Sequence, residues 1–418
     1  MIITDIQWHT YRLPFADSFT TAHGVMATRE GAVITATTEQ GITGIGEMAP
    51  LPEFGGGNLA VACAALSKMV VYLRGRTLDE TLAQIQVEGT GRPQGSPLPY
   101  HVTKGDKTVY GRGDPCGRPA HCGLEIALLD ALGKTRGCSV ATLLSTNASF
   151  PHSEPSSTSV EARCIAPKDG GRGATMLPRL TVPVNAVVGA KSTRAAVAAA
   201  LKAKHESFGC VKLKVGSMGA IQQEVERVAA VRAAIGPEMH LRLDANEAWS
   251  LEDAITILSE CVPYDIQYVE QPVKRDDLAA MHTLRQTVPI LIAADEALHD
   301  LHSARRILDS EAADVLIVKP QLAGGLRIGQ QIIREAAERG VQSVITTTIE
   351  SGISLTAALH LAAASPAITL ECGLATRHLL VDDLICEDLP ILNGFLAVPT
   401  GPGLGITLDK DALDKYRS

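Results

Sequence analysis

The chain has 418 residues and is predicted to be an α/β protein whose C-terminal half forms a parallel barrel with helices outside. Short β-rich runs recur eight times over about 190 residues from Val182 onward. Segments with apolar residues at three- and four-residue spacing lie between them, which is typical of amphipathic helices. In addition, five consecutive runs end in an ionisable side chain, which indicates one shared site at the mouth of the barrel.

The N-terminal part has a different pattern. Alternating apolar segments at 2–11 and 31–40 surround the turn signal EQGITG, and a helical stretch follows at 59–72. This pattern predicts an antiparallel sheet that leads into helices. We therefore expect residues 1–145 to form an α+β capping domain.

Two stretches have no apolar period. Residues 88–119 are dense in Gly, Pro and charge, and residues 146–177 are rich in Ser, Pro and Gly. Structureless loops of this length are unusual inside a compact domain. We expect the first to be a low-complexity insertion in the cap and the second a flexible insertion or linker, with a helix at 122–134 between them.

The barrel is expected over residues 178–375, and residues 376–418 are expected to return to the capping domain. A doubly wound open sheet is disfavoured because its Gly-rich turn after the first strand is absent: Gly189 is followed by AKSTRAAV. The eight predicted strands are VPVNAVVG, GCVKLKVG, MHLRLDAN, IQYVEQP, PILIAADE, ADVLIVKP, QSVITTTIE and AITLECG.

Composition narrows the class of protein. The net charge of −8 argues against nucleic acid or an anionic membrane surface as the partner, because both attract excess Lys and Arg. No run reaches the roughly 18 apolar residues of a membrane span, and the start lacks a basic region before an apolar stretch. We expect a cytoplasmic protein that acts on a small carboxylate substrate.

Cysteine usage agrees with a reducing compartment. The nine cysteines are odd in number and scattered, which does not suit a disulfide framework. Cys116, His121 and Cys122 resemble a metal cluster, but a fourth ligand at zinc spacing is missing, so free thiols in a loop are the favoured interpretation.

The ends of the second to sixth predicted strands carry the chemistry. Taken singly, a charge at a strand end is usually a solvated loop residue. Carboxylates in the middle with lysines on both sides, each about one βα unit from the next, argue for a common site. The residues are Lys212, Lys214, Asp244, Glu270, Asp295 and Lys319.

Three acidic residues that converge in one mouth repel one another unless a cation joins them, and oxygen ligands without His favour Mg²⁺, with Mn²⁺ as a possible substitute. A divalent ion beside lysines suits removal of a proton next to a carboxylate. We expect Lys214 to take this proton and Lys319 to face it from the opposite side as a base, an acid or a stabilising charge.

As an ordered set, these residues resemble the enolase superfamily, in particular its muconate-lactonising subgroup. The resemblance covers the chain outside the two low-complexity stretches. It implies a (β/α)7β barrel under the capping domain, Mg²⁺ held by Asp244, Glu270 and Asp295, and acid/base lysines at 214 and 319. Glu296 and Asn246 would support the metal site, although a turn Asn is an equal alternative. The motifs are KLKVG, RLDANEAW, YVEQP, ADEA and IVKPQLAGGL.

Within the subgroup, ITTTIES and LECG are similar to the o-succinylbenzoate synthases of menaquinone biosynthesis. That resemblance implies elimination of water from a hydroxycyclohexadiene carboxylate, with Thr347 and Thr348 near a substrate carboxylate. Packing of both threonines in a strand is the alternative. The resemblance also implies that the loop PFADSFTTAHG closes over the substrate and carries specificity through Phe19, Thr21 or His23.

Other activities stay open. N-succinylamino acid racemase and muconate cycloisomerase use the same catalytic residues. Dipeptide epimerases carry Asp-x-Asp where this chain has Glu371-Cys372-Gly373, which lowers that interpretation. An inactive barrel serving as a scaffold is disfavoured by the intact lysines and carboxylates. The resemblance also favours a homo-oligomer.

Overall fold

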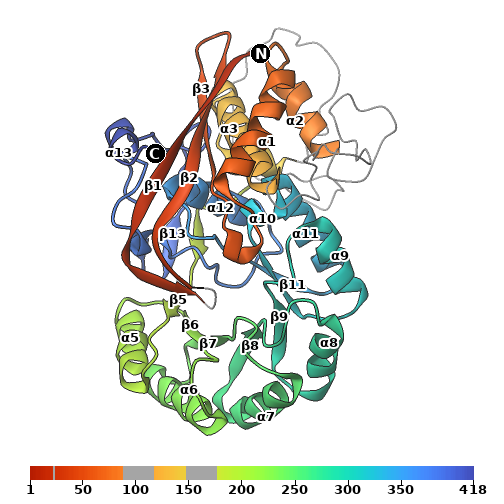
Figure 1. The fold of residues 1–418 in the computed structure, drawn as a ribbon, viewed down its shortest axis with the longest axis vertical. Coiled ribbons are helices and arrows are strands. Elements are labelled where there is room, and N and C mark those ends of the chain that lie inside the picture. The colour runs from red at the N-terminus through yellow and green to blue at the C-terminus, as the bar shows by residue number, and fades with distance from the viewer. Residues whose placement is uncertain (22–23, 88–116, 147–176) are drawn as a thin grey trace, which may run out of the picture.

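The computed structural model describes residues 1–21, 24–87, 117–146 and 177–418. A cap that contains the N-terminal sheet and helices lies above a ring of strands and outer helices (Figure 1). The predicted segments at 88–116 and 147–176 lie outside the described residues.

The cap begins with a three-stranded antiparallel sheet in the order β1-β2-β3, as predicted. Its strands are β1 (Ile3–Thr21), β2 (Gly24–Thr38) and β3 (Thr43–Met48). The hairpin of β1 and β2 reaches from the cap towards the barrel (Figure 1).

The expectation that PFADSFTTAHG forms a loop is wrong for the described residues, whose backbone belongs to the strands β1 and β2. Phe19 pairs with Met26 and Thr21 pairs with Gly24, so the end of β1 rejoins the β1–β2 ladder after a register shift between Pro14 and Phe19. An extended hairpin satisfies backbone groups that a loop would leave to water. The side chains of Phe19 and Thr21, and His23 altogether, lie outside the described part, so their predicted contact with substrate stays a prediction.

Helices cover one side of this sheet. Helix α3 packs closely against β3, because Gly46 and Gly123 have no side chains: a Cβ on Gly46 would lie 2.1 Å from the carbonyl oxygen of Gly123. The helices and turns of the cap are η1 (Pro52–Phe54), α1 (Leu59–Leu73), α2 (Leu78–Val87), α3 (Gly117–Arg136) and α4 (Val140–Ser145).

The start of α3 corrects two expectations. Residues 117–119 are helical and not part of an insertion, and the helix starts five residues before the predicted 122. His121 and Cys122 are buried within α3, so Cys122 is a free thiol as predicted, but it lies in a helix and not in a loop. Burial against β3 orders this stretch despite its Gly and Pro content, while Cys116 lies outside the described residues.

The barrel has seven described parallel strands in consecutive order. They are β5 (Ala186–Val188), β6 (Cys210–Lys214), β7 (His240–Asp244), β8 (Ile266–Glu270), β9 (Leu291–Ala294), β10 (Val315–Val318) and β11 (Gln342–Ile345). This confirms the predicted barrel fold, in which each strand follows its sequence neighbour.

Helices alternate with these strands and form the outer ring (Figure 1). Ser or Asp side chains accept hydrogen bonds at the N-termini of α5, α7, α8, α9 and α12, which explains where these helices begin. The helical elements are α5 (Thr193–His205), α6 (Ile221–Ile235), α7 (Leu251–Cys261), η2 (Val262–Tyr264), α8 (Leu278–Thr287), α9 (Leu301–Asp309), α10 (Pro320–Ala323), α11 (Leu326–Glu338) and α12 (Gly352–Ala363).

The barrel closes at the predicted eighth strand, which is reduced to two bridges. Cys372 pairs with Val184 and Gly373 pairs with Thr346, so these two residues join the β5 side to the β11 side. The guanidinium of Arg242 donates to the carbonyl oxygen of Glu371 over 2.7 Å and occupies an acceptor that a longer ladder would use.

The first predicted strand is also split. Residues Thr181–Pro183 form β4, which pairs with β13 (Phe395–Ala397) and, through it, β12 (Ile391–Leu392). The C-terminal residues return to the cap: the amide of Arg12 donates to the carbonyl of Tyr416 over 2.9 Å. The remaining elements of this segment are η3 (Arg377–Leu379) and α13 (Lys410–Lys415).

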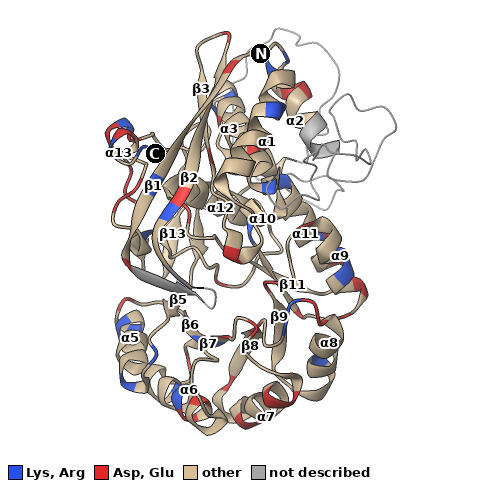
Figure 2. Cartoon of the chain, in the orientation of Figure 1, with Lys and Arg blue, Asp and Glu red and all other residues tan. Residues whose placement is uncertain are grey.

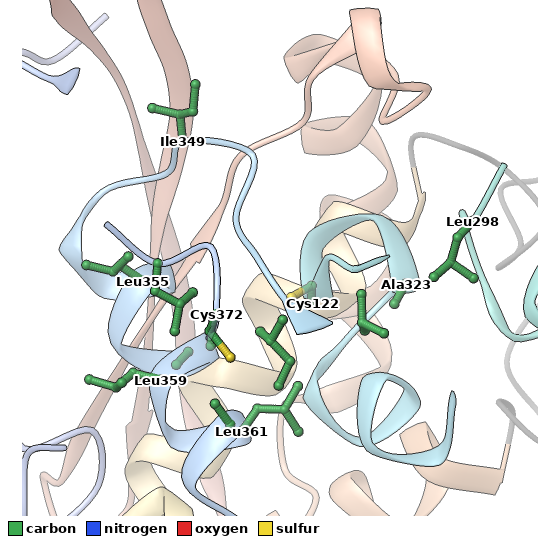
Figure 3. Packing of buried hydrophobic residues seen from close by; sticks show 14 of the residues in the cluster. Cys122, Leu298, Ala323, Ile349, Leu355, Leu359, Leu361 and Cys372 are labelled. Carbon is green, nitrogen blue, oxygen red and sulfur yellow. The ribbon is translucent and has the colours of Figure 1, made fainter. Parts of the chain in front are cut away.

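Cap and barrel share one hydrophobic core. In Figure 3, Cys122 of α3 lies among buried side chains of the barrel, including Ala323 of α10 and Leu361 of α12. Burial of apolar surface across this boundary therefore holds the cap on the barrel.

Charged residues of both signs lie on the outer ring, with basic ones on α5 and acidic ones on α7 (Figure 2). None of the helices in the described ranges is both long and apolar enough to cross a membrane.

Candidate active site

The predicted charged residues meet at one edge of the barrel. Lys214 is in register with Asp244, and Asp244 is in register with Glu270, at the C-terminal ends of β6, β7 and β8. Asp295 and Lys319 directly follow β9 and β10. The parallel order of these strands brings the five residues to one mouth, as the spacing predicted.

Lys212 lies between two carboxylates. Its Nζ donates to Asp244 Oδ2 over 2.8 Å and to Glu270 Oε1 over 2.6 Å. Burial alone would lower the pKa of Lys212, but the charges of Asp244 and Glu270 outweigh it and raise this pKa. Lys212 is thus held as a cation that partly neutralises the acidic cluster.

Lys214 is the most accessible of the three lysines. Its Nζ lies 2.7 Å from Asp244 Oδ2 and 2.8 Å from Asn246 Oδ1. The side chain is 35% exposed, against 15% for Lys212 and 7% for Lys319. Among these lysines, it is therefore the one that a molecule entering from solvent reaches most readily.

Lys319 approaches the acidic cluster from the other side. Its Nζ donates to Asp295 Oδ1 and lies 4.5 Å from the centroid of the Phe54 ring. Burial disfavours its ammonium form, but Asp295 and Glu296 outweigh burial and raise the pKa of Lys319. Three strands that end in carboxylates separate it from Lys214.

The acids of the cluster differ in environment. Burial would raise the pKa of Asp244, but its contacts with Lys212 and Lys214 lower it. Burial and the neighbouring Asp244 raise the pKa of Glu270 well above its ordinary value. Burial and the charges of Asp295 and Asp244 raise the pKa of Glu296 to about 7. These carboxylates thus repel one another across the mouth.

The fit of this cluster to a metal ion rests on its donor atoms. In the described part of the chain, no three His, Cys, Asp or Glu side chains stand close enough together to hold an ion as they are placed. The donors of Asp244, Glu270 and Asp295 are nevertheless all carboxylate oxygens, which suit Mg²⁺. Glu270 Oε2 is buried and has no hydrogen-bond partner among the described residues. A cation there requires Lys212, Lys214 and Lys319 to release the acids they bind.

Two polar residues support the cluster. Asn246 accepts a hydrogen bond from Lys214 and donates through Nδ2 to Glu296 Oε1 over 2.9 Å, so it links Lys214 to Glu296. Gln271, which the sequence analysis missed, accepts the amides of Asp295 and Ala297 at Oε1, each over 3.1 Å. Its position directly after Glu270 could have indicated from the sequence that it lies near the cluster.

The two threonines after β11 have different surroundings. The Thr348 hydroxyl donates to Glu350 Oε1 over 2.5 Å, so its hydrogen is engaged. The Thr347 hydroxyl shares a 3.1 Å hydrogen bond with that of Thr376. Both threonines are buried, and Thr347 lines a small cavity with Glu350 and Ser354.

Phe54 is a second residue that the sequence analysis missed. It comes from the Pro- and Gly-rich loop after β3 in the cap, yet it covers a lysine of the barrel. Only the tertiary contact reveals this role, since the loop lies 265 residues before Lys319.

Comparison with known families decides the classification. Residues 3–145 match the family "Mandelate racemase / muconate lactonizing enzyme, N-terminal domain", and residues 194–412 match the family "Enolase C-terminal domain-like". The chain belongs to the enolase superfamily. It is an enzyme of the muconate-lactonizing subgroup, as the ordered motifs predicted.

Individual relatives of this superfamily differ in activity. The chain is 38% identical over 226 residues to an o-succinylbenzoate synthase of Thermobifida fusca, covering 53% of this chain and 67% of that protein. It is 26% identical to a hydrophobic dipeptide epimerase of Enterococcus faecalis, covering 97% and 100%. Membership of the superfamily therefore leaves the substrate open.

A solved structure of the same fold is the dipeptide epimerase of Cytophaga hutchinsonii, complexed with Mg and a dipeptide. It has a TM-score of 0.79 and 24% identity, covering 100% of this chain and 98% of that one. This likeness supports the fold described above for the described residues.

Proposed function

We propose that this enzyme removes the α-proton next to a substrate carboxylate and eliminates water, as an o-succinylbenzoate synthase does. The observation that carries the proposal is the placement of Lys214 and Lys319 on the two sides of Asp244, Glu270 and Asp295. The 38% identity to the Thermobifida fusca synthase supports this substrate over the others.

The proposed metal ligands are Asp244, Glu270 and Asp295, with Mg²⁺ as the ion and Mn²⁺ as a substitute. When bound, the ion supplies positive charge to the oxygens of the substrate carboxylate and so acidifies the neighbouring C–H bond. Asn246 and Glu296 hold the ends of this cluster in place through their mutual hydrogen bond.

Lys214 is the proposed base. Its partly exposed amino group lies 2.7 Å from Asp244 Oδ2, so a substrate bound against the acids would lie within its reach, and its neutral amine form would act as the base. Lys214 takes the α-proton and then returns it to the departing hydroxyl as water forms. Elimination on one face needs only this one lysine.

Lys319 and Lys212 act mainly as charges in this proposal. As ammonium groups, they would stabilise the negative charge that develops on the substrate. Thr347 is the proposed contact for a second substrate carboxylate. Thr348 has its hydrogen engaged by Glu350 and is the weaker candidate for that contact.

Racemisation of N-succinylamino acids is a second candidate. A lysine on each side of the cluster is the arrangement that removal of a proton from one face and its return to the other requires. Dipeptide epimerisation has less support, because Glu371 is bound by Arg242 over 2.7 Å and by His240 over 2.9 Å and is not free to hold an amino group. Muconate cycloisomerisation has no feature of its own in its favour.

The test is a steady-state assay with the hydroxycyclohexadiene carboxylate precursor of o-succinylbenzoate and Mg²⁺. Turnover near roughly 10 s⁻¹, lost in Lys214→Ala and in enzyme stripped with EDTA, would support the proposal. Lys204→Ala, on the outer face of α5, is the matched control and should keep the activity. Absence of turnover, together with deuterium exchange on N-succinylamino acids in D₂O, would transfer the function to a racemase.

A further inference from the structure

Arg29 of β2 is a buried cation that gathers backbone carbonyls of the cap. Its Nη1 donates to the carbonyl oxygens of Glu30 over 2.7 Å and Pro50 over 2.8 Å, and its Nη2 donates to that of Ala49. Ala49 and Pro50 begin the loop that leads to Phe54. The Arg29 side chain thus holds the backbone of the first two residues after β3.

The same guanidinium also reaches the barrel. Arg29 Nε donates to the carbonyl oxygen of Thr348 over 3.1 Å, and Nη2 lies 3.4 Å from the Thr348 hydroxyl. Glu350 holds the other side of this residue, accepting from the Thr348 amide over 2.8 Å. Arg29 therefore connects the cap loop to the segment between β11 and α12.

These two segments carry residues that lie next to the candidate site. The cap loop places Phe54 over Lys319, and the segment after β11 places Thr347 beside Thr376. We propose that Arg29 is a positioning residue that sets the cap loop 49–57 against the barrel loop 346–350, and so fixes Phe54 and Thr347 relative to each other. This inference deepens the proposed function and rests on it for the role of Thr347.

The chemistry of the arginine suits this task. Its planar fork donates in several fixed directions at once, whereas a lysine has a single ammonium on a flexible stem. Burial of the charge is offset by the nearby carboxylate of Glu350, on which Arg29 acts electrostatically. Lysine at this position keeps the charge but cannot span both loops.

A separate anchor holds the far end of the barrel loop. Glu47 accepts the amides of Ser351 and Ser354, each over 2.9 Å, and so caps the N-terminus of α12 from the cap sheet. Loss of the Arg29 contacts should therefore release residues 347–349 without detaching α12.

The first experiment compares backbone hydrogen exchange in wild type and Arg29→Lys. We expect the amides of Phe54–Gly56 and Thr348–Ile349 to exchange at least about tenfold faster in the variant, because both loops lose the same restraint. Arg232→Lys is the matched control, since Arg232 also binds four carbonyl oxygens but at the other end of the barrel strands. It should leave these amides unchanged.

The second readout is kinetic. For the hydroxycyclohexadiene carboxylate, Arg29→Lys should raise KM about tenfold while kcat falls less than about threefold, because substrate contacts loosen and Lys214 does not move. Unchanged exchange in Arg29→Lys, or an equal rise in Arg232→Lys, would overturn the inference. So would an unchanged KM.

If Arg29→Lys does not fold, Glu350→Gln replaces it. Faster exchange that spreads from residues 348–349 to residues 54–56 supports the link through Arg29, and exchange confined to 348–349 overturns it. Because the exchange readout needs no substrate, a wild type that turns over none of the substrates would contradict the proposed function and leave this inference standing.

Discussion

The ammonium of Lys319 lies 4.5 Å from the centre of the Phe54 ring, so an aromatic side chain of the cap covers one side of a lysine of the barrel. Aromatic faces attract cations at this distance. The contact helps to hold Lys319 on Asp295 and excludes water from one side of the lysine. The surroundings of Lys319 therefore depend on the position of the cap.

Phe54→Leu should lower kcat/KM by about 2- to 30-fold, which corresponds to about 0.5–2 kcal/mol for the lost cation–π contact. Phe54→Tyr keeps the ring and should stay within about twofold of wild type. Steady-state kinetics measures both variants, with circular dichroism to establish that each is folded. Equal losses of kcat/KM in Phe54→Leu and Phe54→Tyr would show that the contact of the ring face with Lys319 does not affect the activity.

Metal binding should be visible without any substrate. Because an ion that binds only the folded state stabilises it, Mg²⁺ at 100 times its Kd should raise the free energy of unfolding by about 2.7 kcal/mol. Glu270→Gln removes one proposed ligand charge and should abolish this increase. Thermal unfolding with MgCl₂ against NaCl of equal ionic strength measures the effect, and an equal gain in both proteins would place the ion elsewhere.

His360 should make the fold sensitive to acid. Its Nδ1 accepts from the Ala141 amide over 3.3 Å and its Nε2 lies 3.0 Å from the Leu404 carbonyl, so the buried ring is neutral. Burial lowers its pKa to about 4 from an ordinary 6.5. The unfolded chain then binds the proton first, so this contribution is complete above pH 6.5 and falls by about 3 kcal/mol as pH drops towards 4.

Urea unfolding at pH 7 and pH 5 measures this loss. His360→Leu should be less stable than wild type at pH 7, yet lose less stability between the two pH values. The exposed His302→Gln is the control and should follow wild type. A pH dependence in His360→Leu as steep as that of wild type would assign the acid sensitivity to other groups.

Arg242 should be essential for stability of the barrel. Its side chain is fully buried, pairs with Glu371 and donates to Asn185 Oδ1 over 3.3 Å, which joins β7 to both edges of the closing seam. Arg242→Met leaves Glu371 without its buried partner and should lower the free energy of unfolding by about 3–5 kcal/mol. Urea unfolding measures it.

The matched control is Arg339→Met, which breaks the exposed pair of Arg339 with Asp309. We expect a loss below about 1 kcal/mol there, because solvent screens exposed pairs. Similar losses in the two variants would mean that the buried pair contributes no more than a surface one.

The gathering of charged residues at the mouth was predictable because each lies at or just after the end of a strand. In a parallel barrel, consecutive strands end at one edge, so Lys214, Asp244 and Glu270 had to meet once the strands were recognised. The eighth strand was not predicted as well. The buried side chain of Arg242 donates a hydrogen bond to the carbonyl oxygen of Glu371 in this run. Local β-propensity cannot predict a contact between residues so far apart in the sequence.

The sequence by itself determined the barrel, the antiparallel sheet of the cap, the family and the set of charged residues, since periodicity and strand-end spacing are local properties. The tertiary structure alone decided which lysine binds which acid, and that Phe54, Gln271 and Arg29 contact residues of the candidate site. These residues act across separations of up to 319 positions, as between Arg29 and Thr348. Contacts at such separations arise only when packing brings the cap onto the barrel.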